Sequence, residues 1–295
     1  MTNDFPLPEA DLRRLAENAL AEDRADDDAT TAALVPGEQT GRAAIIAKSE
    51  GILAGLPIAR AVFLAADPSL AWKPSLEDGH RLSPGNRVVT IEGSLSSILR
   101  AERAALNYLT HLSGVATATA AVVHSLEGTG CRLRDTRKTI PGLRTLEKYA
   151  VRVGGGSNHR PNLAQGVLIK DNHLAALAQR GLDIADALRL AREANPDMRI
   201  EIEVTTVEEA RRALDAAADE MLLDNMPPEQ MREVVALAAA RDPRPALEAS
   251  GGLTLENARQ VAETGVDFIS IGAITHSAKA LDMSLELAAP ASSQP

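Results

Sequence analysis

The sequence predicts an α/β protein whose larger part is a TIM-like barrel. After residue 130, six short apolar segments alternate with amphipathic ones, which is the pattern of parallel βα units. Such a series closes most naturally into a barrel. No GxGxxG follows the first strand, as an open dinucleotide-binding sheet would require. Aromatic residues make up only 2% of the chain, so Ala, Leu, Val and Ile must build the core, which suits helices packed on a sheet.

The first part of the chain mixes helices and strands. Apolar residues at helical spacing, with acids in the first turn, predict a helix over 8–21. The pattern then predicts two short strands in 42–55, a helix over 55–67, and a turn with a strand in 83–94. Residues 94–126 are Ala-rich, and we expect a long helical region there that is interrupted near Gly114.

The second part supplies the βα units. The expected strands are 131–135, 166–170, 199–204, 220–224, 246–250 and 267–272. The expected helices between them are 184–195, 207–218, 228–240 and 254–265.

Composition and charge exclude several classes of protein. The net charge of −10 argues against general nucleic-acid binding. The single cysteine, Cys131, allows neither an internal disulfide nor a cysteine zinc cluster. The N-terminus has no basic and apolar regions of a secretory signal, and no apolar run reaches the ~18 residues of a membrane span. We therefore expect a soluble cytoplasmic protein.

Positive charge is nevertheless concentrated between Cys131 and Arg160, where eight Lys or Arg residues stand against two acids. The segment lacks the interleaved aromatics of a nucleic-acid surface, so a small anion suits it better. Arginine forks match planar carboxylates. The candidate ligand-binding side chains are Arg137, Lys138, His159, Arg160 and Lys170. We interpret three other cations as the solvated face of a helix: Arg144, Lys148 and Arg152.

Polar or glycine residues end five of the expected strands. They are Lys170, Glu203, Asp224, Ser250 and Gly272. In a barrel, the carboxyl ends of all strands open onto one face, where active sites form. Glu203 and Asp224 are candidates either to hold Mg²⁺ or to hydrogen-bond sugar hydroxyls. The spacing of the histidines matches no compact zinc motif: His159, His173 and His276.

The last two strands lead into small-residue loops that each precede a helix. These loops are Ser250-Gly251-Gly252 and the segment from Gly272 to Ser277. Small residues let backbone N–H groups approach an anion, and barrels often hold phosphate in these loops. Phosphate loops, acids and a cationic pocket for carboxylates together indicate phosphoribosyl transfer to an aromatic acid.

Motifs along nearly the whole chain, from about residue 15 to 287, resemble the quinolinate phosphoribosyltransferase family. They include "AEDRADDDAT", "AERAALNYLTHLSGVATAT", "RDTRKTIPGLRTLEKYAVRVGGGSNHR", "VLIKDNH", "IEIEVTTVEEA", "LLDNM" and "EASGGLTLENA". The resemblance implies transfer of phosphoribosyl from phosphoribosyl pyrophosphate to quinolinate with decarboxylation, a step of NAD biosynthesis. It also implies Mg²⁺ as cofactor.

The same resemblance implies an N-terminal α/β sandwich domain, 1–115, completed by about 277–295, and an incomplete α/β barrel, 116–276. It implies a homodimer in which Arg103 reaches the neighbour's pocket. The residues that would grip quinolinate and the diphosphate are Arg137, Lys138, His159, Arg160 and Lys170. Those near the ribose hydroxyls and Mg²⁺ would be Glu203 and Asp224. The 5-phosphate site would be lined by Ser250, Gly251, Gly272 and His276. The catalytic set would be Lys138, Lys170, Glu203 and Asp224.

The residues leave three other interpretations of the function open. A paralogue from molybdenum-transport operons would share the fold and use another acceptor. Lys170 at a strand end also fits a Schiff-base aldolase. A catalytically inactive phosphate-binding module would keep the loops without the chemistry.

Overall fold

The computed structural model describes residues 5–288, which form two compact units. The first unit contains the chain up to Ala120, Thr145–Gly155, and the chain from Ala278 onward; the second contains Ala121–Arg144 and Gly156–Ser277. Part of the C-terminal segment expected to complete the first domain, 289–295, lies outside the described residues. Among the residues described, no helix combines the length and the apolar character needed to cross a membrane.

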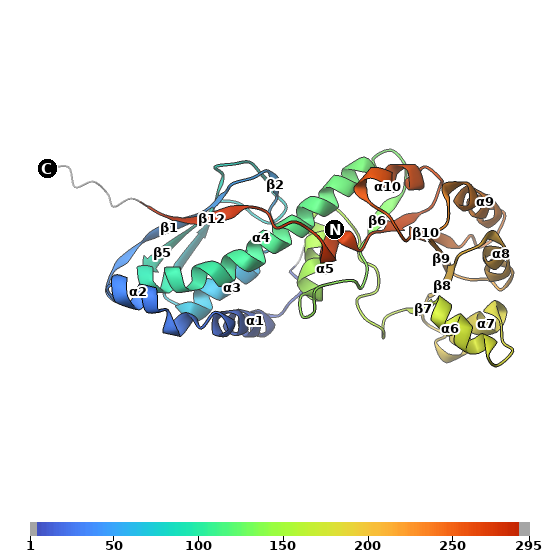
Figure 1. Ribbon diagram of the computed structural model, residues 1–295, viewed down its shortest axis with the longest axis horizontal. Helices are drawn as coiled ribbons and strands as arrows, with labels where there is room; N and C mark the ends of the chain where they lie inside the picture. The colour runs from blue at the N-terminus through green and yellow to red at the C-terminus, as the bar shows by residue number, and fades with distance from the viewer. Residues whose placement is uncertain (1–4, 289–295) are drawn as a thin grey trace. The chain divides into compact units, whose positions relative to one another are not determined.

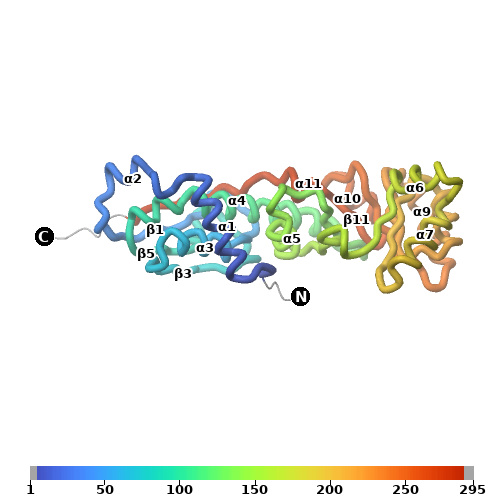
Figure 2. Tube along the Cα trace, turned by 90° about the horizontal axis from the view of Figure 1, so that it is seen from below, coloured from blue at the N-terminus to red at the C-terminus, as the bar shows by residue number. Residues whose placement is uncertain are grey.

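The first unit is built on a four-stranded antiparallel sheet with the order β12-β1-β5-β3. The strands are β1 (Thr40–Ala47), β3 (Ala71–Pro74), β5 (Arg87–Ser94) and β12 (Met283–Leu287). A separate two-stranded sheet joins β2 (Gly51–Ile52) and β4 (Arg81–Leu82). Strand β12, from the far end of the sequence, pairs with β1, and β1 lies beside β5 (Figure 2).

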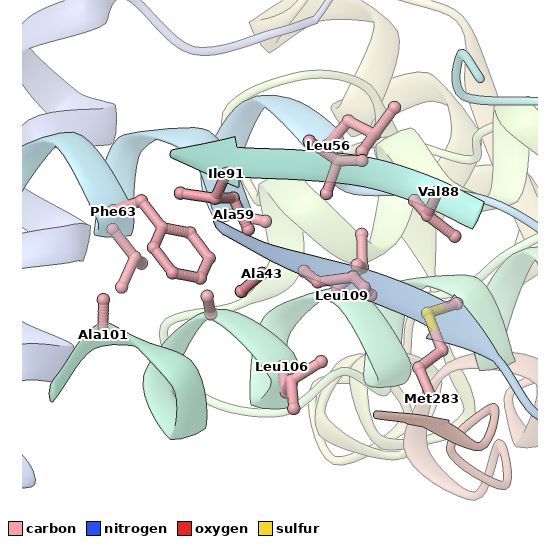
Figure 3. Close-up of a cluster of buried hydrophobic side chains, with 14 of the residues drawn as sticks. Ala43, Leu56, Ala59, Phe63, Val88, Ile91, Ala101, Leu106, Leu109 and Met283 are labelled. Carbon is pink, nitrogen blue, oxygen red and sulfur yellow. The ribbon is translucent and has the colours of Figure 1, made fainter. Parts of the chain in front are cut away.

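One face of this sheet carries helices. They are α1 (Glu9–Glu22), α2 (Ala29–Leu34), α3 (Leu56–Ala66) and α4 (Leu95–Ser125), with a short 3₁₀ turn at Ala25–Asp27. Alternate residues of β1 are buried, so one strand face builds the core. Figure 3 shows side chains from the sheet and from α3 and α4 gathered in one apolar cluster that includes Phe63, Ile91, Leu106 and Leu109. This is the sandwich of one sheet layer and one helix layer predicted from the sequence.

Helix α4 corrects one expectation, because it runs without a break from Leu95 to Ser125. Gly114 does not interrupt it. A Cβ at Gly114 would lie 2.2 Å from the carbonyl oxygen of Lys279, so the glycine serves close backbone packing. Gly114 within a helical pattern does mark a special position, but the glycine is required for close packing and does not break the helix.

The second unit contains a six-stranded parallel sheet in the order β6-β11-β10-β9-β8-β7 (Figure 1). The strands are β6 (Arg132–Arg134), β7 (Val167–Ile169), β8 (Ile200–Val204), β9 (Glu220–Asp224), β10 (Ala246–Ser250) and β11 (Phe268–Ser270). The last strand pairs with the first, as in a barrel, but β6 and β7 do not pair and both are edges. The barrel is therefore incomplete, and it opens between β6 and β7.

Each expected helix of this unit is present. They are α7 (Ile184–Ala194), α8 (Val207–Asp215), α9 (Pro228–Ala239) and α10 (Leu255–Ala262), with the additional α6 (Asp171–Ala178) and α11 (Ala273–His276). Asp183 and Thr206 cap α7 and α8 through their side-chain oxygens, which satisfies free backbone N–H groups. Helix α5 (Arg144–Val153) lies mostly in the segment that belongs to the first unit.

Candidate active site

A cavity of about 630 Å³ opens at the carboxyl ends of the barrel strands. Most of the side chains singled out in the sequence line it. They are Arg137, Lys138, His159, Arg160, Lys170, Glu203, Asp224, Ser250 and Gly251. The residues that line this cavity do not include Arg103, Gly272 or His276.

A second cavity of about 600 Å³ lies at the opposite, amino ends of β8, β9 and β10. Two of its three arginines are already paired: Arg241 with Asp215 and Arg244 with Asp267. Barrel chemistry belongs at the carboxyl ends of the strands. We therefore take the first cavity as the candidate site.

Asp135 holds the loop that carries the basic residues, a role that the sequence did not reveal. Its side chain is fully buried directly after β6. One carboxylate oxygen accepts from the His159 backbone N–H at 2.8 Å, and the other accepts from Asn158 Nδ2 at 2.6 Å. The "RDT" and "NHR" segments are thus tied together. In the sequence, the mark of this role is an acid within a run of basic residues.

Arg144 joins the same two segments and is not merely a solvated helix residue. It donates to Thr139 Oγ1 at 3.1 Å and, through Nη1 and Nη2, to the carbonyls of Pro161 and Arg137. The solvated interpretation was also wrong for Lys148, which is only 4% exposed. Cations of a basic segment can organise its loops as well as contact a ligand.

Arg137 and Arg160 present donors that the protein leaves unused. Within the described part of the chain, the Nε atoms of both are buried and have no hydrogen-bond partner. Arg160 Nη1 donates to the Gly166 carbonyl at 3.0 Å, which fixes its direction. Burial and the adjacent charge of Arg137 lower the pKa of Arg160 below its ordinary value. Two close guanidinium groups that line the cavity form a site for an anion.

His159 directs both of its ring nitrogens to the protein. Nε2 lies 2.7 Å from Glu201 Oε2, and Nδ1 accepts from the Arg160 backbone N–H at 2.8 Å. Burial lowers the pKa of His159, but the hydrogen bond and charge of Glu201 outweigh it and raise the pKa above its ordinary value. Because Nδ1 accepts this N–H, it carries no proton, and the ring proton lies on Nε2. His159 thus positions Arg160.

Lys170 and Glu203 form an ion pair across neighbouring strands. Nζ lies 2.9 Å from Glu203 Oε2, and the lysine side chain is 44% exposed while the glutamate is 11% exposed. A Schiff-base lysine is activated by an apolar pocket or a neighbouring cation. The neighbour of Lys170 is a carboxylate instead, and the partly exposed lysine side chain remains open to contact with an anionic ligand.

Asp224 ends β9 next to Asn225, whose backbone is left-handed with φ +52°. Asn225 Nδ2 donates to Asp224 Oδ2 at 2.8 Å, and the Asn225 backbone N–H donates to the Ser250 carbonyl at 2.9 Å. Glu203 and Asp224 therefore line one cavity with different partners, an ammonium and an amide. Two carboxylates with room for substrate oxygens fit the Mg²⁺ that the resemblance implies.

The loop after β10 passes very close to Asn225. Gly251 has φ +90°, and a Cβ there would lie 2.4 Å from Asn225 Oδ1. Gly252, with φ +61°, has only a 3.9 Å contact to the same atom. Only glycine fits at Gly251, both for its backbone conformation and for this approach.

The remaining predicted residues lie outside the cavity lining. Gly272 lies beside Lys138, since a Cβ there would be 2.9 Å from Lys138 Cδ. Thr275 Oγ1 donates to the Lys138 carbonyl at 2.7 Å, which ties α11 to the basic segment. His276 is exposed, with Nδ1 2.6 Å from Ser277 Oγ. Arg103 is an exposed residue of α4 in the first unit.

A charged network lies inside the barrel, beneath the cavity, and sequence reasoning identified only part of it. Arg134 Nη1 contacts Glu220 and lies 2.6 Å from Glu248 Oε2. Burial, followed by the charge of Glu201, raises the pKa of Glu248 to about 7, against the opposing effects of His159 and Arg134. Glu201 and Glu203 alternate with isoleucines in the sequence, which fits either a solvated strand face or, in a barrel, a face that points into the lumen. The structure buries Glu201 inside the barrel, together with the acid of "ALEAS", Glu248.

Family models match almost the whole chain. The quinolinate phosphoribosyl transferase N-terminal domain matches residues 28–113, and its C-terminal domain matches residues 115–286. The nicotinate-nucleotide pyrophosphorylase (carboxylating) of Mycobacterium leprae is 42% identical over 278 residues, covering 93% of this chain and 96% of the relative. The human enzyme of the same name is 40% identical over 284 residues, covering 95% and 93%.

Solved structures agree with the sequence comparisons. The nicotinate-nucleotide pyrophosphorylase from Francisella tularensis superposes with a TM-score of 0.88 at 37% identity, covering 96% of this chain and 98% of that one. The protein called NadC from Streptococcus pyogenes gives a TM-score of 0.89 at 38% identity, covering 96% and 99%. These likenesses extend over both units.

Proposed function

Because the chain belongs to the quinolinate phosphoribosyltransferase family, we propose that it transfers phosphoribosyl from phosphoribosyl pyrophosphate to quinolinate with loss of CO₂. The products are nicotinate mononucleotide, CO₂ and pyrophosphate, and the reaction belongs to NAD biosynthesis. The observation that carries the proposal is the pair Arg137 and Arg160, two neighbouring guanidinium groups that line a cavity also lined by acids and a glycine loop. We place the reaction in the cytoplasm, as the sequence predicts.

The cations of the cavity bind the dicarboxylate. Arg137 and Arg160 supply planar forks for the carboxylates of quinolinate, and Lys138 and Lys170 add charge for quinolinate and the diphosphate. His159 holds Arg160 through its Nδ1 contact. Concentrated positive charge inside a protein of net charge −10 also speeds the encounter with anionic substrates.

Glu203, Asp224 and the Ser250–Gly252 loop bind phosphoribosyl pyrophosphate. The acids accept hydrogen bonds from ribose hydroxyls, and they are the residues that would hold Mg²⁺. The ion, when bound, neutralises the leaving pyrophosphate. Gly251 and Gly252 let backbone N–H groups approach the 5-phosphate, and Gly272 and His276 extend that site.

The transfer step needs alignment and charge placement more than a nucleophilic side chain. The pyridine nitrogen of quinolinate attacks C1 of the ribose as pyrophosphate leaves, and positive charge develops on the sugar. Glu203 and Asp224 are placed to stabilise that charge, while the lysines stabilise the departing oxygens. The ribosylated pyridinium nitrogen then stabilises the electron pair left at C2 as CO₂ departs.

We further propose a homodimer in which Arg103 of each chain completes the site of the other. Arg103 is exposed on α4, so its guanidinium is available to a second chain. The family resemblance supports this arrangement.

The direct test supplies quinolinate, phosphoribosyl pyrophosphate and Mg²⁺ and measures nicotinate mononucleotide and CO₂. We expect equal amounts of pyrophosphate and CO₂. Borohydride trapping with a carbonyl substrate is the companion experiment, because a covalent adduct on Lys170 would support the aldolase interpretation. Binding of quinolinate without turnover would support an inactive module, and turnover only with another acceptor would support the paralogue.

A further inference from the structure

The barrel interior holds more carboxylate than the cations there can neutralise. Glu248 is fully buried, and Glu201 and Glu220 are each 6% exposed. Arg134 from β6 contacts Glu220 from β9 and Glu248 from β10, while His159 contacts Glu201 from β8. Arg160 adds a second cation near enough to interact with the charge of Glu201, so with His159 neutral two cations face three acids.

Two oxygens of this cluster lack partners. Within the described residues, Glu201 Oε1 and Glu248 Oε1 are buried without a hydrogen-bond partner. One atom from each of His159, Glu201 and Glu248 lies within 4.8 Å of the others. Buried carboxylates this close cannot all stay ionised without a further positive charge, and a shared proton supplies it at the least cost.

Glu248 is the acid of this cluster that lies against the active-site cavity. It lines the candidate active site, one inward-facing position below Ser250 on β10, whereas Glu201 and Glu220 do not line it. Its Oε2 is occupied by Arg134, so a proton on the unpartnered Oε1 is the simplest assignment. The pKa of about 7 agrees with a proton held at neutral pH.

The proposed reaction needs such a proton, and this inference rests on the proposed function. Loss of CO₂ breaks the bond between C2 and its carboxylate and leaves the electron pair on C2. We propose that Glu248 is a catalytic acid that delivers the proton to C2 of the ribosylated pyridine after CO₂ has left. The C2–H bond forms as the Oε1–H bond breaks, and Glu248 becomes a carboxylate. One proton from water restores the acid, so each turnover consumes one proton.

Several other donors in the cavity are less suitable. Lys170 is engaged by Glu203, and a guanidinium does not give up its proton in proteins. The His159 Nε2 proton is directed at Glu201.

A route for renewing the proton lies beside the cluster. A cavity of about 150 Å³ is lined by residues of β6, β7, β8 and β9, where the barrel is open between β6 and β7. Arg134, His159, Glu201 and Glu220 line it. The site is polar and large enough for water, which would lie against Glu201 and Glu220 of the cluster.

The test compares Glu248→Gln with Glu220→Gln in rapid-quench experiments, measuring pyrophosphate and CO₂ separately. Both variants remove a carboxylate from Arg134, but only Glu248 lines the active-site cavity. Without its acid, the carbanion recaptures CO₂. We therefore expect E248Q to release pyrophosphate in the first turnover at nearly the wild-type rate while CO₂ forms about 10²–10⁴-fold more slowly. The ribosylated diacid should accumulate, and E220Q should form CO₂ nearly as fast as it releases pyrophosphate.

Three results would overturn the assignment. CO₂ formation by E248Q at the wild-type rate would exclude Glu248 as the donor. Equal slowing of pyrophosphate release and CO₂ formation in E248Q would show that Glu248 only positions other groups. A selective loss of CO₂ formation in E220Q would show the same, because Glu220 does not line the cavity. Thermal unfolding monitors the fold, and Glu248→Asp takes the place of E248Q if that variant does not fold. Because the aspartate keeps an acid but withdraws it by one methylene, a smaller but still selective delay of CO₂ formation is expected. Failure of the wild-type protein to release pyrophosphate from phosphoribosyl pyrophosphate in the presence of quinolinate would contradict the proposed function instead.

Discussion

Replacing Gly251 with alanine should damage the phosphoribosyl site more than the same change at Gly252. Both glycines have positive φ values, +90° and +61°. An alanine in the left-handed region costs about 1–2 kcal/mol at either position. Only at Gly251 does the new Cβ meet a neighbour, 2.4 Å from Asn225 Oδ1. The backbone cost is shared, so the difference between the two variants reports the collision.

The collision must move Asn225 or the loop. Asn225 Nδ2 donates to Asp224 Oδ2 at 2.8 Å, and a hydrogen bond to a charged group contributes about 1.5–3 kcal/mol. Without this hydrogen bond, the Asp224 carboxylate is no longer held in the orientation that the proposed substrate contact needs. We expect G251A to weaken binding of phosphoribosyl pyrophosphate by roughly 10-fold or more beyond G252A, since about 1.4 kcal/mol corresponds to a factor of ten.

Isothermal titration with phosphoribosyl pyrophosphate and Mg²⁺ measures this difference, and thermal unfolding measures the shared backbone cost. Asn225→Gly is the matched control, because glycine tolerates the φ of +52° at that position and removes the side chain that collides. In the N225G background, the excess effect of G251A should disappear. Equal affinities for G251A and G252A, or an excess that persists in N225G, would refute the reasoning.

Three further predictions concern binding, pH and assembly. Arg137→Ala should weaken quinolinate binding by about 2–5 kcal/mol, because it leaves a substrate carboxylate unpaired in a buried site; unchanged affinity by calorimetry would remove Arg137 from the site. Because the pKa of Glu248 is raised from 4.5 to about 7, the folded state keeps a proton that the unfolded state loses in this window. The stability of the wild-type protein relative to E248Q should therefore fall as pH rises from 4.5 to about 7, and parallel pH profiles in urea denaturation would contradict the assignment. Mixing inactive Arg103→Ala and Lys170→Ala chains should restore part of the activity, since one site of each mixed dimer is intact; no recovery in confirmed mixed dimers would argue against a shared site.

Much of the barrel could be predicted from the sequence because its strands are short apolar runs between amphipathic helices. All six expected strands are present, and β9 and β10 have the predicted bounds. Polar residues at strand ends placed the cavity correctly, because parallel strands bring those ends to one face. The four-residue β3 and the short α2 were missed, since so few residues show little periodicity.

The interior of the site was harder to predict because its contacts join distant parts of the chain. Asp135 and Arg144 lie within the basic run, and only the fold shows that they hold its loops together. Arg134 and Glu248 are more than a hundred positions apart and meet inside the barrel because β6 and β10 both flank β11. Local patterns predict which face a side chain occupies, but not which charge lies opposite.

The central claim is that the cations around the cavity bind a pyridine with two adjacent carboxylates. Calorimetric titration with quinolinate and, separately, with nicotinate tests it most directly, because nicotinate lacks only the 2-carboxylate. The account predicts that quinolinate binds much more tightly than nicotinate and that Arg137→Ala and Arg160→Ala each remove most of the difference. Equal binding of the two acids, or a preference that survives both substitutions, would contradict it.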